Sequence, residues 1–203
     1  MYSRKTELVF GFHGCDESVV HSVVCGETTL KHSNNTYDWL GHGMYFWENS
    51  ESRAIEWAQY LKINPERAKH PIKIPSVLGA VINPGYCLDL TDYENLGLLK
   101  DAYDMLIKST NKAGFPTNKI VGENEDLLLR DLDCATIETL HTFMEDTKKL
   151  PYDSVRGVFW EGNELYPGAG FREKDHIQLC VRNPNCIKGF FVPRKLDSNY
   201  MKV

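Results

Sequence analysis

Strand-forming segments at both ends of the chain enclose a helical middle, and this order constrains the fold more than any other feature. Apolar runs typical of strands lie at 7–12, 77–82, 87–90, 155–160, 176–181 and 187–192. Apolar residues recur at helical spacing at 50–61, 98–106 and 137–144. The pattern therefore predicts a sheet built from both ends of the chain, with helices between them.

The composition bounds the architecture and the partners. The chain has 203 residues, 42% of them hydrophobic, and contains no repeats and no long linker, so we expect one domain over residues 1–203. Lys and Arg number 23 against 28 Asp and Glu, which gives a net charge of −5. This balance excludes the broad basic surface that grips nucleic acid indiscriminately, although it allows a local basic groove.

Localisation and metal content are predicted from what the sequence lacks. The start is polar and no run of about 18 apolar residues occurs, so we expect a cytoplasmic protein without membrane association. The six cysteines include no C-x-x-C pair, which favours reduced and mostly buried thiols. His176 and Cys180 have no second ligand pair at zinc spacing, so no metal is expected.

Three residues stand in contexts that favour chemistry. His13 follows an apolar strand and is expected at its end, on rigid backbone. Tyr45 follows the paired glycines of Gly41-His42-Gly43, which permit a tight backbone path. Gln178 alternates with the apolar positions of its strand and is expected to face a cleft. Each has a structural alternative: a core histidine, a core tyrosine, or an exposed glutamine bonded to water.

The order of these segments resembles the ADP-ribosyltransferase superfamily, in the branch shared by diphtheria toxin and the poly(ADP-ribose) polymerases. Phe12-His13-Gly14 is similar to its first motif, Gly41-His42-Gly43-Met44-Tyr45-Phe46 to its second, and Gln178 occupies the place of its late-strand glutamate. The late segment also resembles uncharacterised bacterial proteins, so the likeness spans nearly the whole chain. The resemblance implies an α+β fold with a split β-sheet core, flanking helices and a helical insertion.

The resemblance also implies roles in binding NAD⁺ as co-substrate. His13 would hydrogen-bond a ribose hydroxyl, and the backbone of Gly14 would hold the nicotinamide carboxamide. Tyr45 would stack on the nicotinamide ring. Gly41 and Gly43 would shape the turn that presents it. Catalysis would thus depend on His13, Tyr45 and Gln178.

Two departures from the family pattern modify this expectation. Gln178 brings a dipole where the family has a carboxylate, which argues against polymer synthesis and favours mono-transfer or weak catalysis. Glu173 or Asp175 nearby would supply the missing charge, unless their run is a solvated loop. In the helix after Tyr45, Ser52 and Trp57 are the nearest candidates for the family's serine and second stacking aromatic, and Trp57 also fits a core position.

The expected function is NAD-dependent mono-ADP-ribosylation of a protein or nucleic acid, in the setting of a bacterial toxin or defence factor with an inhibitor or antitoxin partner. The glycine-rich loop 161–171 is expected either to recognise the acceptor, through Tyr166, Phe171 and the adjacent Arg172, or to form an ordinary turn. The alternatives are an NAD glycohydrolase and a catalytically silent module that binds NAD or ADP-ribose.

Overall fold

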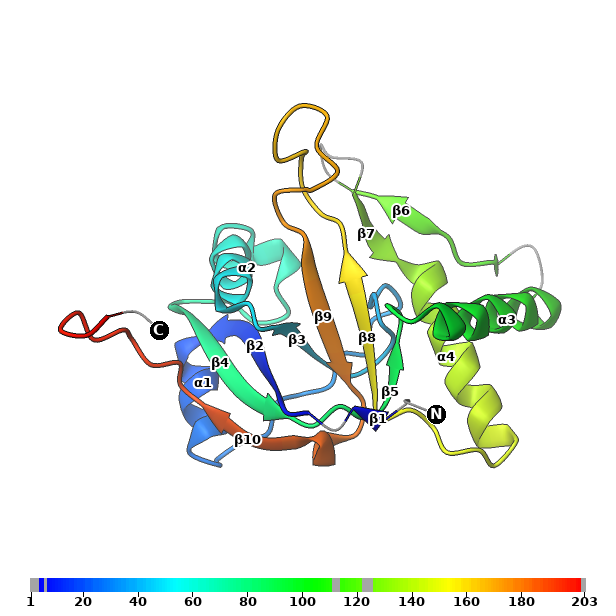
Figure 1. Ribbon diagram of the computed structural model, residues 1–203, viewed down its shortest axis with the longest axis horizontal. Coiled ribbons are helices and arrows are strands. Elements are labelled where there is room, and N and C mark those ends of the chain that lie inside the picture. Colours follow the sequence, from blue (N-terminus) through cyan, green and yellow to red (C-terminus); the bar gives the residue numbers. More distant parts are fainter. Residues whose placement is uncertain (1–3, 6, 111–113, 122–125, 202–203) are drawn as a thin grey trace.

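Eight strands form one sheet at the centre of the molecule in the computed structural model, which describes residues 4–5, 7–110, 114–121 and 126–201 (Figure 1). The strand order is β1-β5-β8-β9-β3-β2-β4-β10, antiparallel throughout except between β5 and β8. Two further strands, β6 and β7, pair with each other. The strands are β1 (Arg4–Lys5), β2 (Val9–Asp16), β3 (Met44–Glu48), β4 (Pro75–Ile82), β5 (Gly85–Asp89), β6 (Asn118–Ile120), β7 (Leu127–Arg130), β8 (Ser154–Phe159), β9 (His176–Val181) and β10 (Ile187–Phe191).

The ladder between the central strands β2 and β3 is short. These strands pair at two positions, Gly11 with Glu48 and Phe12 with Trp47, whereas β2 pairs with β4 at eight positions. The prediction that the first strand ends at His13 is wrong. The strand continues to Asp16, because β4 still pairs with it where β3 no longer does. The backbone groups that face the opening between β2 and β3 need other partners.

Helices cover both faces of this sheet. The helices are α1 (Glu17–Val24), α2 (Glu51–Ile63), α3 (Tyr93–Ser109) and α4 (Asp131–Asp146), with short 3₁₀ turns at Pro65–Arg67 and Pro184–Cys186. On one face, Val20 and Val23 of α1 pack in a core with Phe46. On the other face, α2 packs against Trp47, and α3 and α4 pack further along the same face (Figure 1). Apolar burial on both faces stabilises the sheet.

Helix α2 lies unusually close to β2. Its inward residues Ala54 and Ala58 are fully buried and small. A Cβ atom at Gly14 would lie 2.0 Å from the Ala54 carbonyl oxygen, so only glycine at this position admits the helix at this distance. Helix α2 therefore covers β2 and β3, the strands that carry His13 and Trp47.

The α+β class predicted from the sequence is confirmed, and β9 coincides with the predicted segment 176–181. The predicted strands at 77–82, 87–90, 155–160 and 187–192 correspond to β4, β5, β8 and β10 within two residues. Strands β1 and β3, helix α1 and the pair β6 and β7 were not predicted. Within the described ranges, no helix combines the length and apolar character needed to cross a membrane.

Candidate functional site

The three motif residues lie on three neighbouring strands: His13 on β2, Tyr45 on β3 and Gln178 on β9. Tyr45 pairs with Cys180 and Trp47 pairs with Gln178, so Tyr45 and Gln178 share one face of the sheet. Strand alternation gives His13 the opposite direction, and its ring lies 6.1 Å from that of Phe46. The fold thus brings Tyr45 and Gln178 to one face and sets His13 at the opening beside them.

The His13 side chain bonds a backbone carbonyl of β3 where the β2–β3 ladder has ended. Its Nδ1 lies 2.8 Å from the Tyr45 carbonyl oxygen, and since a carbonyl only accepts, Nδ1 carries the proton. Burial lowers the pKa of His13, and the hydrogen bond to Tyr45 raises it by less. The ring is therefore neutral near pH 7, and its Nε2 is an acceptor.

Tyr45 is fixed by the glycine turn that precedes it. Its hydroxyl donates to the Gly41 carbonyl at 2.6 Å and accepts from the Leu40 amide at 2.8 Å. Burial raises the pKa of Tyr45 well above its ordinary value, so this hydroxyl stays protonated. Gly41 has φ +75, and a Cβ atom at Gly43 would lie 2.5 Å from Cys180 Sγ. The sequence-based expectation that these glycines shape the turn agrees with this geometry.

Gln178 lies half-buried at the centre of the sheet. It pairs with Trp47 on one side and Gly157 on the other, and His176 precedes it on the same face. Its neighbours across the two ladders are therefore a tryptophan and a glycine. An amide in this setting offers both a donor and an acceptor but no charge.

A cluster that sequence reasoning missed lies on the same face, and we call Trp47, Arg53, His176 and Glu161 the Trp47 cluster. The Arg53 guanidinium lies 5.9 Å from the centre of the Trp47 ring, and the Trp47 and His176 rings are 6.2 Å apart. Glu161 Oε2 accepts from Arg53 Nη2 at 3.0 Å and lies 3.8 Å from His176 Nδ1. Trp47, Arg53 and His176 come from β3, α2 and β9, and Glu161 comes from the connection that follows β8.

Ion pairs extend this cluster to the loop between β8 and β9. Arg53 also donates to Glu56, and Glu56 accepts from Lys174 with a separation of 2.9 Å. Helix α2 is therefore tied to both ends of the β8–β9 connection.

Glu161 differs sharply from the two carboxylates expected from the sequence. Its side chain is 15% exposed, and burial raises its pKa, partly offset by Arg53 and Lys174. Glu173 and Asp175 are exposed and bond within their own loop, to Asn163 and to the Arg172 amide. In the sequence, the only indication that Glu161 has a role was its position directly after the predicted strand 155–160.

The remaining sequence candidates occupy the rim. Gly14 lies under α2, with Ala54 in the space that its missing side chain leaves. Ser52 is exposed in the first turn of α2, with its hydroxyl 3.4 Å from that of Ser50. Trp57 is 36% exposed, and its ring lies 6.2 Å from that of Trp47. Of these, Gly14 and Trp57 lie beside the cluster, and Ser52 does not contact it.

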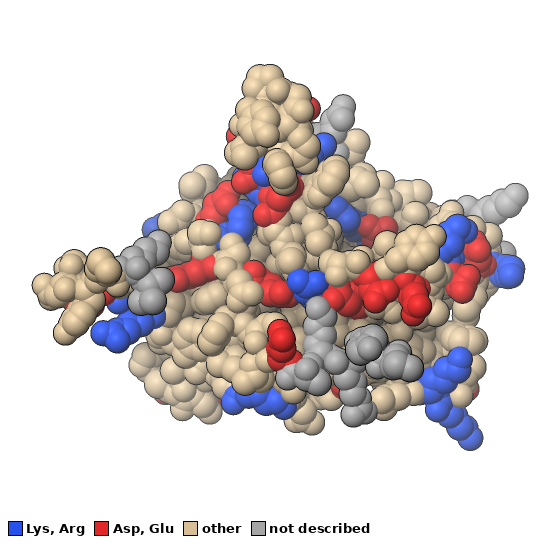
Figure 2. All heavy atoms as spheres, in the orientation of Figure 1, with Lys and Arg blue, Asp and Glu red and all other residues tan. Residues whose placement is uncertain are grey.

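The β8–β9 connection projects from the body of the molecule above the cluster (Figure 1). Leu165, Tyr166 and Phe171 are each more than half exposed on it. The projecting lobe is mostly uncharged in Figure 2, in contrast to the charged band across the middle of this face. The connection thus exposes apolar side chains on its projecting lobe.

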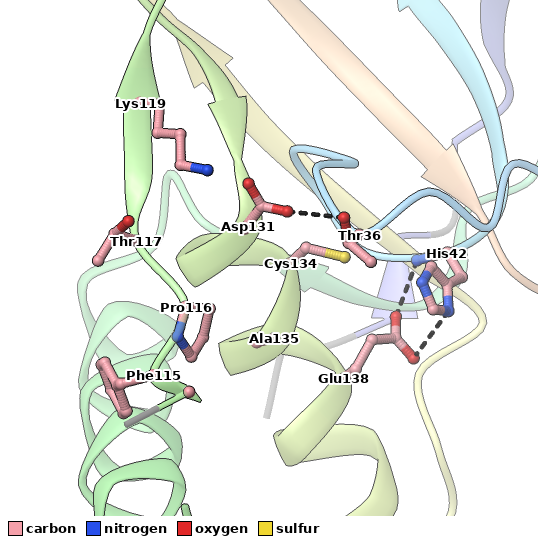
Figure 3. A pocket seen from close by; sticks show the side chains of 11 residues that line it. Thr36, His42, Phe115, Pro116, Thr117, Lys119, Asp131, Cys134, Ala135 and Glu138 are labelled. Atoms are coloured by element: carbon pink, nitrogen blue, oxygen red, sulfur yellow. Dashed lines mark hydrogen bonds and ion pairs between the residues drawn. The ribbon is translucent and has the colours of Figure 1, made fainter. Parts of the chain in front are cut away.

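A separate cavity of about 570 Å³ lies between α4 and the residues before Tyr45 (Figure 3). Thr36 donates to Asp131 at 2.6 Å on its wall, and the His42 amide donates to Glu138 at 2.8 Å. Its lining residues are Thr36, His42, Gly114, Phe115, Pro116, Thr117, Lys119, Asp131, Cys134, Ala135 and Glu138. His13, Tyr45 and Gln178 are not among them, so this cavity is distinct from the site that the motifs predict.

Comparisons of the chain with protein-family models, with curated proteins and with solved structures find no match.

Proposed function

We propose that this chain is an NAD⁺-dependent mono-ADP-ribosyltransferase that modifies a macromolecular acceptor. One observation carries the proposal: His13, Tyr45 and Gln178, which are far apart in sequence, lie on three adjacent strands. Tyr45 and Gln178 share one face of the sheet, and His13, which points the other way, bonds the Tyr45 carbonyl across the opening between β2 and β3. The short ladder between β2 and β3 supports the split sheet expected of that superfamily.

Each residue would have one task in this site. When bound, NAD⁺ supplies an ADP-ribosyl group, and positive charge develops on the ribose as its bond to nicotinamide breaks. His13 would accept a hydrogen bond from a ribose hydroxyl at Nε2, because Nδ1 is committed to Tyr45. Tyr45 would offer its ring face, because the Gly41 turn holds its hydroxyl. Gln178 would orient a ribose hydroxyl through its amide.

The neutral Gln178 favours transfer of a single unit over polymer synthesis. A dipole stabilises a developing cation less than a carboxylate does. We assign the missing charge to Glu161, which is largely buried on the same face, rather than to the exposed Glu173 or Asp175. This assignment makes Glu161 the residue whose neutralisation slows the reaction most among these acids.

The acceptor would dock on the β8–β9 connection. Its exposed Leu165, Tyr166 and Phe171 suit a protein surface or stacked bases, and the net charge of −5 favours protein. The loop begins at Glu161, so an acceptor bound there would reach the same face as Gln178.

The test uses the whole chain with cell lysate and NAD⁺ labelled in its adenylate phosphate. We expect label on a macromolecule, reduced at least about tenfold in His13→Ala and in Gln178→Ala. His70→Ala, at an exposed position outside the site, is the matched control. Protease and nuclease digestion of the product then distinguish protein from nucleic acid. Absence of label together with absence of nicotinamide release contradicts the proposal.

A catalytically silent module that binds NAD⁺ or ADP-ribose is the second candidate, favoured by Gln178 in place of an acid. It predicts saturable NAD⁺ binding that His13→Ala weakens, with no release of nicotinamide. An NAD⁺ glycohydrolase instead predicts nicotinamide release without label on any macromolecule. Label on macromolecules and nicotinamide release from the same incubation, together with an NAD⁺ binding titration, separate the three candidates.

A further inference from the structure

Unsatisfied buried nitrogens are concentrated in the Trp47 cluster. Among the described residues, four buried side-chain nitrogens have no hydrogen-bond partner, and three of them are Trp47 Nε1, Arg53 Nε and His176 Nε2. The fourth belongs to His141, which packs elsewhere, near Tyr152. A buried polar atom without a hydrogen-bond partner lowers the stability of the fold by about 1–3 kcal/mol. Three such atoms in one cluster therefore indicate a binding site for a polar group.

The chemistry of the three atoms is settled by their neighbours. His176 Nδ1 donates to the Lys174 carbonyl at 2.6 Å, and burial lowers the pKa of His176 to about 4, so Nε2 is a lone-pair acceptor. Trp47 Nε1 is always a donor. Arg53 bonds Glu56 and Glu161 through its terminal nitrogens, which leaves Nε–H as a further donor. The cluster therefore offers two donors and one acceptor.

We propose that Trp47, Arg53 and His176 form a binding site for a primary carboxamide, the group carried by the nicotinamide of NAD⁺. The carboxamide oxygen accepts from Trp47 Nε1 and Arg53 Nε, and its NH₂ donates to His176 Nε2. A carboxylate has no proton for His176, and an ammonium cannot accept from the two donors. This inference rests on the proposed function and adds the residues that recognise the leaving group.

The position of the cluster fits this assignment. Trp47 is the direct partner of Gln178 across the β3–β9 ladder, so a carboxamide held at Trp47 lies next to the residue assigned to the ribose. The face of Gly14 where a side chain would stand is filled by Ala54 of α2. The Trp47 cluster thus adds side-chain groups to carboxamide recognition.

Entry of the ligand depends on Arg53. The three nitrogens are closed to solvent, and the Arg53 side chain lies over the Trp47 ring from α2. Its side chain is only 11% exposed and is held between Glu56 and Glu161. Binding therefore requires this side chain to shift while its ion pairs are kept or exchanged.

The experiment compares the affinity of the whole chain for NAD⁺ and for its 3-acetylpyridine analogue, which keeps the carbonyl and lacks the NH₂. We expect wild type to bind NAD⁺ about tenfold more tightly than the analogue, the value of one hydrogen bond to a buried group. His176→Asn retains a donor near the position of Nδ1 but removes the Nε2 acceptor, and should bring the ratio close to one. Trp47→Phe should weaken both ligands about equally and leave the ratio intact.

Trp160→Phe, which changes an indole that is 63% exposed, is the matched control and should alter neither affinity. If wild type binds NAD⁺ and the analogue equally, ordered water fills the cluster and the inference is wrong, while the proposed function stands. An unchanged ratio in His176→Asn contradicts it as well. If wild type binds neither ligand, the proposed function fails and this inference falls with it.

Discussion

Two aromatic residues on the same face of β3 differ in how their polar atoms are satisfied. Tyr45 has both a donor and an acceptor partner for its hydroxyl, within a turn of the chain that immediately precedes it. Trp47, two residues later, has a buried Nε1 with no partner, beside two more such nitrogens. Fully satisfied groups rigidify a structure, whereas unsatisfied ones are tolerated where a ligand or water completes them. We therefore interpret the Tyr45 turn as a rigid structural element and the Trp47 cluster as the part of the site that binds a polar group of the ligand.

The largest effect on stability should come from Gly43→Ala, which disturbs the turn that holds Tyr45. The new Cβ would lie 2.5 Å from Cys180 Sγ and 2.7 Å from the Val181 carbonyl oxygen, and the latter belongs to the central strand β9. We expect a loss of about 3 kcal/mol in the free energy of unfolding, from overpacking. Denaturant titration measures it. Gly97→Ala, in α3 with no atom near the new methyl, is the control and should be neutral or stabilising.

Tyr45→Phe should come next. It keeps the ring and removes the hydroxyl, so the Leu40 amide and the Gly41 carbonyl lose their partner. We expect a loss of about 2 kcal/mol in stability, with NAD⁺ affinity retained because the ring face is unchanged. Denaturant titration and calorimetric NAD⁺ titration check the two halves. A variant as stable as wild type would show that the turn does not depend on this hydroxyl.

Glu161→Gln probes the Trp47 cluster. Removing the charge should lower the rate of nicotinamide release about tenfold, with the matched variant Glu173→Gln, exposed on the following loop, near the wild-type rate. Gln178→Glu should restore part of the rate in the Glu161→Gln background, because it returns a carboxylate to the same face. Equal rates for Glu161→Gln and Glu173→Gln would show that no carboxylate of this cluster acts.

The smallest effect is a pH dependence that comes from His176. The unfolded residue, with a pKa near 6.5, takes up a proton that the folded residue, with a pKa of about 4, does not. Stability is therefore lost as the pH falls from 6.5 toward 4, and from pH 7 to 5.5 this residue should account for about 1 kcal/mol. His176→Asn should lose stability less steeply than wild type over this range. Parallel pH profiles for the two proteins would contradict the burial of a neutral His176.

The elements that the sequence predicted are those with a local signal. Alternation and apolar runs were enough for β4, β5, β8, β9 and β10, and for the α+β class. Helix α1 was missed because its four valines suit strands equally well, although Asp16 caps it through the Ser18 amide.

The residues of the candidate site also differ in whether a local sequence signal identifies them. His13, Tyr45 and Gln178 could be named from the order of their motifs, because adjacent glycines mark His13 and Tyr45 and strand alternation marks Gln178. The Trp47 cluster could not be found, since Arg53 and Glu161 stand in charged, polar stretches that read as solvated surface. Their burial comes from the approach of α2 to the β8–β9 connection, a contact between segments far apart in sequence.

Amide hydrogen exchange with and without NAD⁺ tests the central claim most directly, because it locates the bound nucleotide on the chain. We predict slower exchange in β2 around His13, in the turn and strand from Gly41 to Trp47, and in β9 around Gln178. The segments that line the separate cavity on α4 and β6 should exchange at the same rate in both samples. Protection confined to that cavity, or no protection at saturating NAD⁺, would contradict the account.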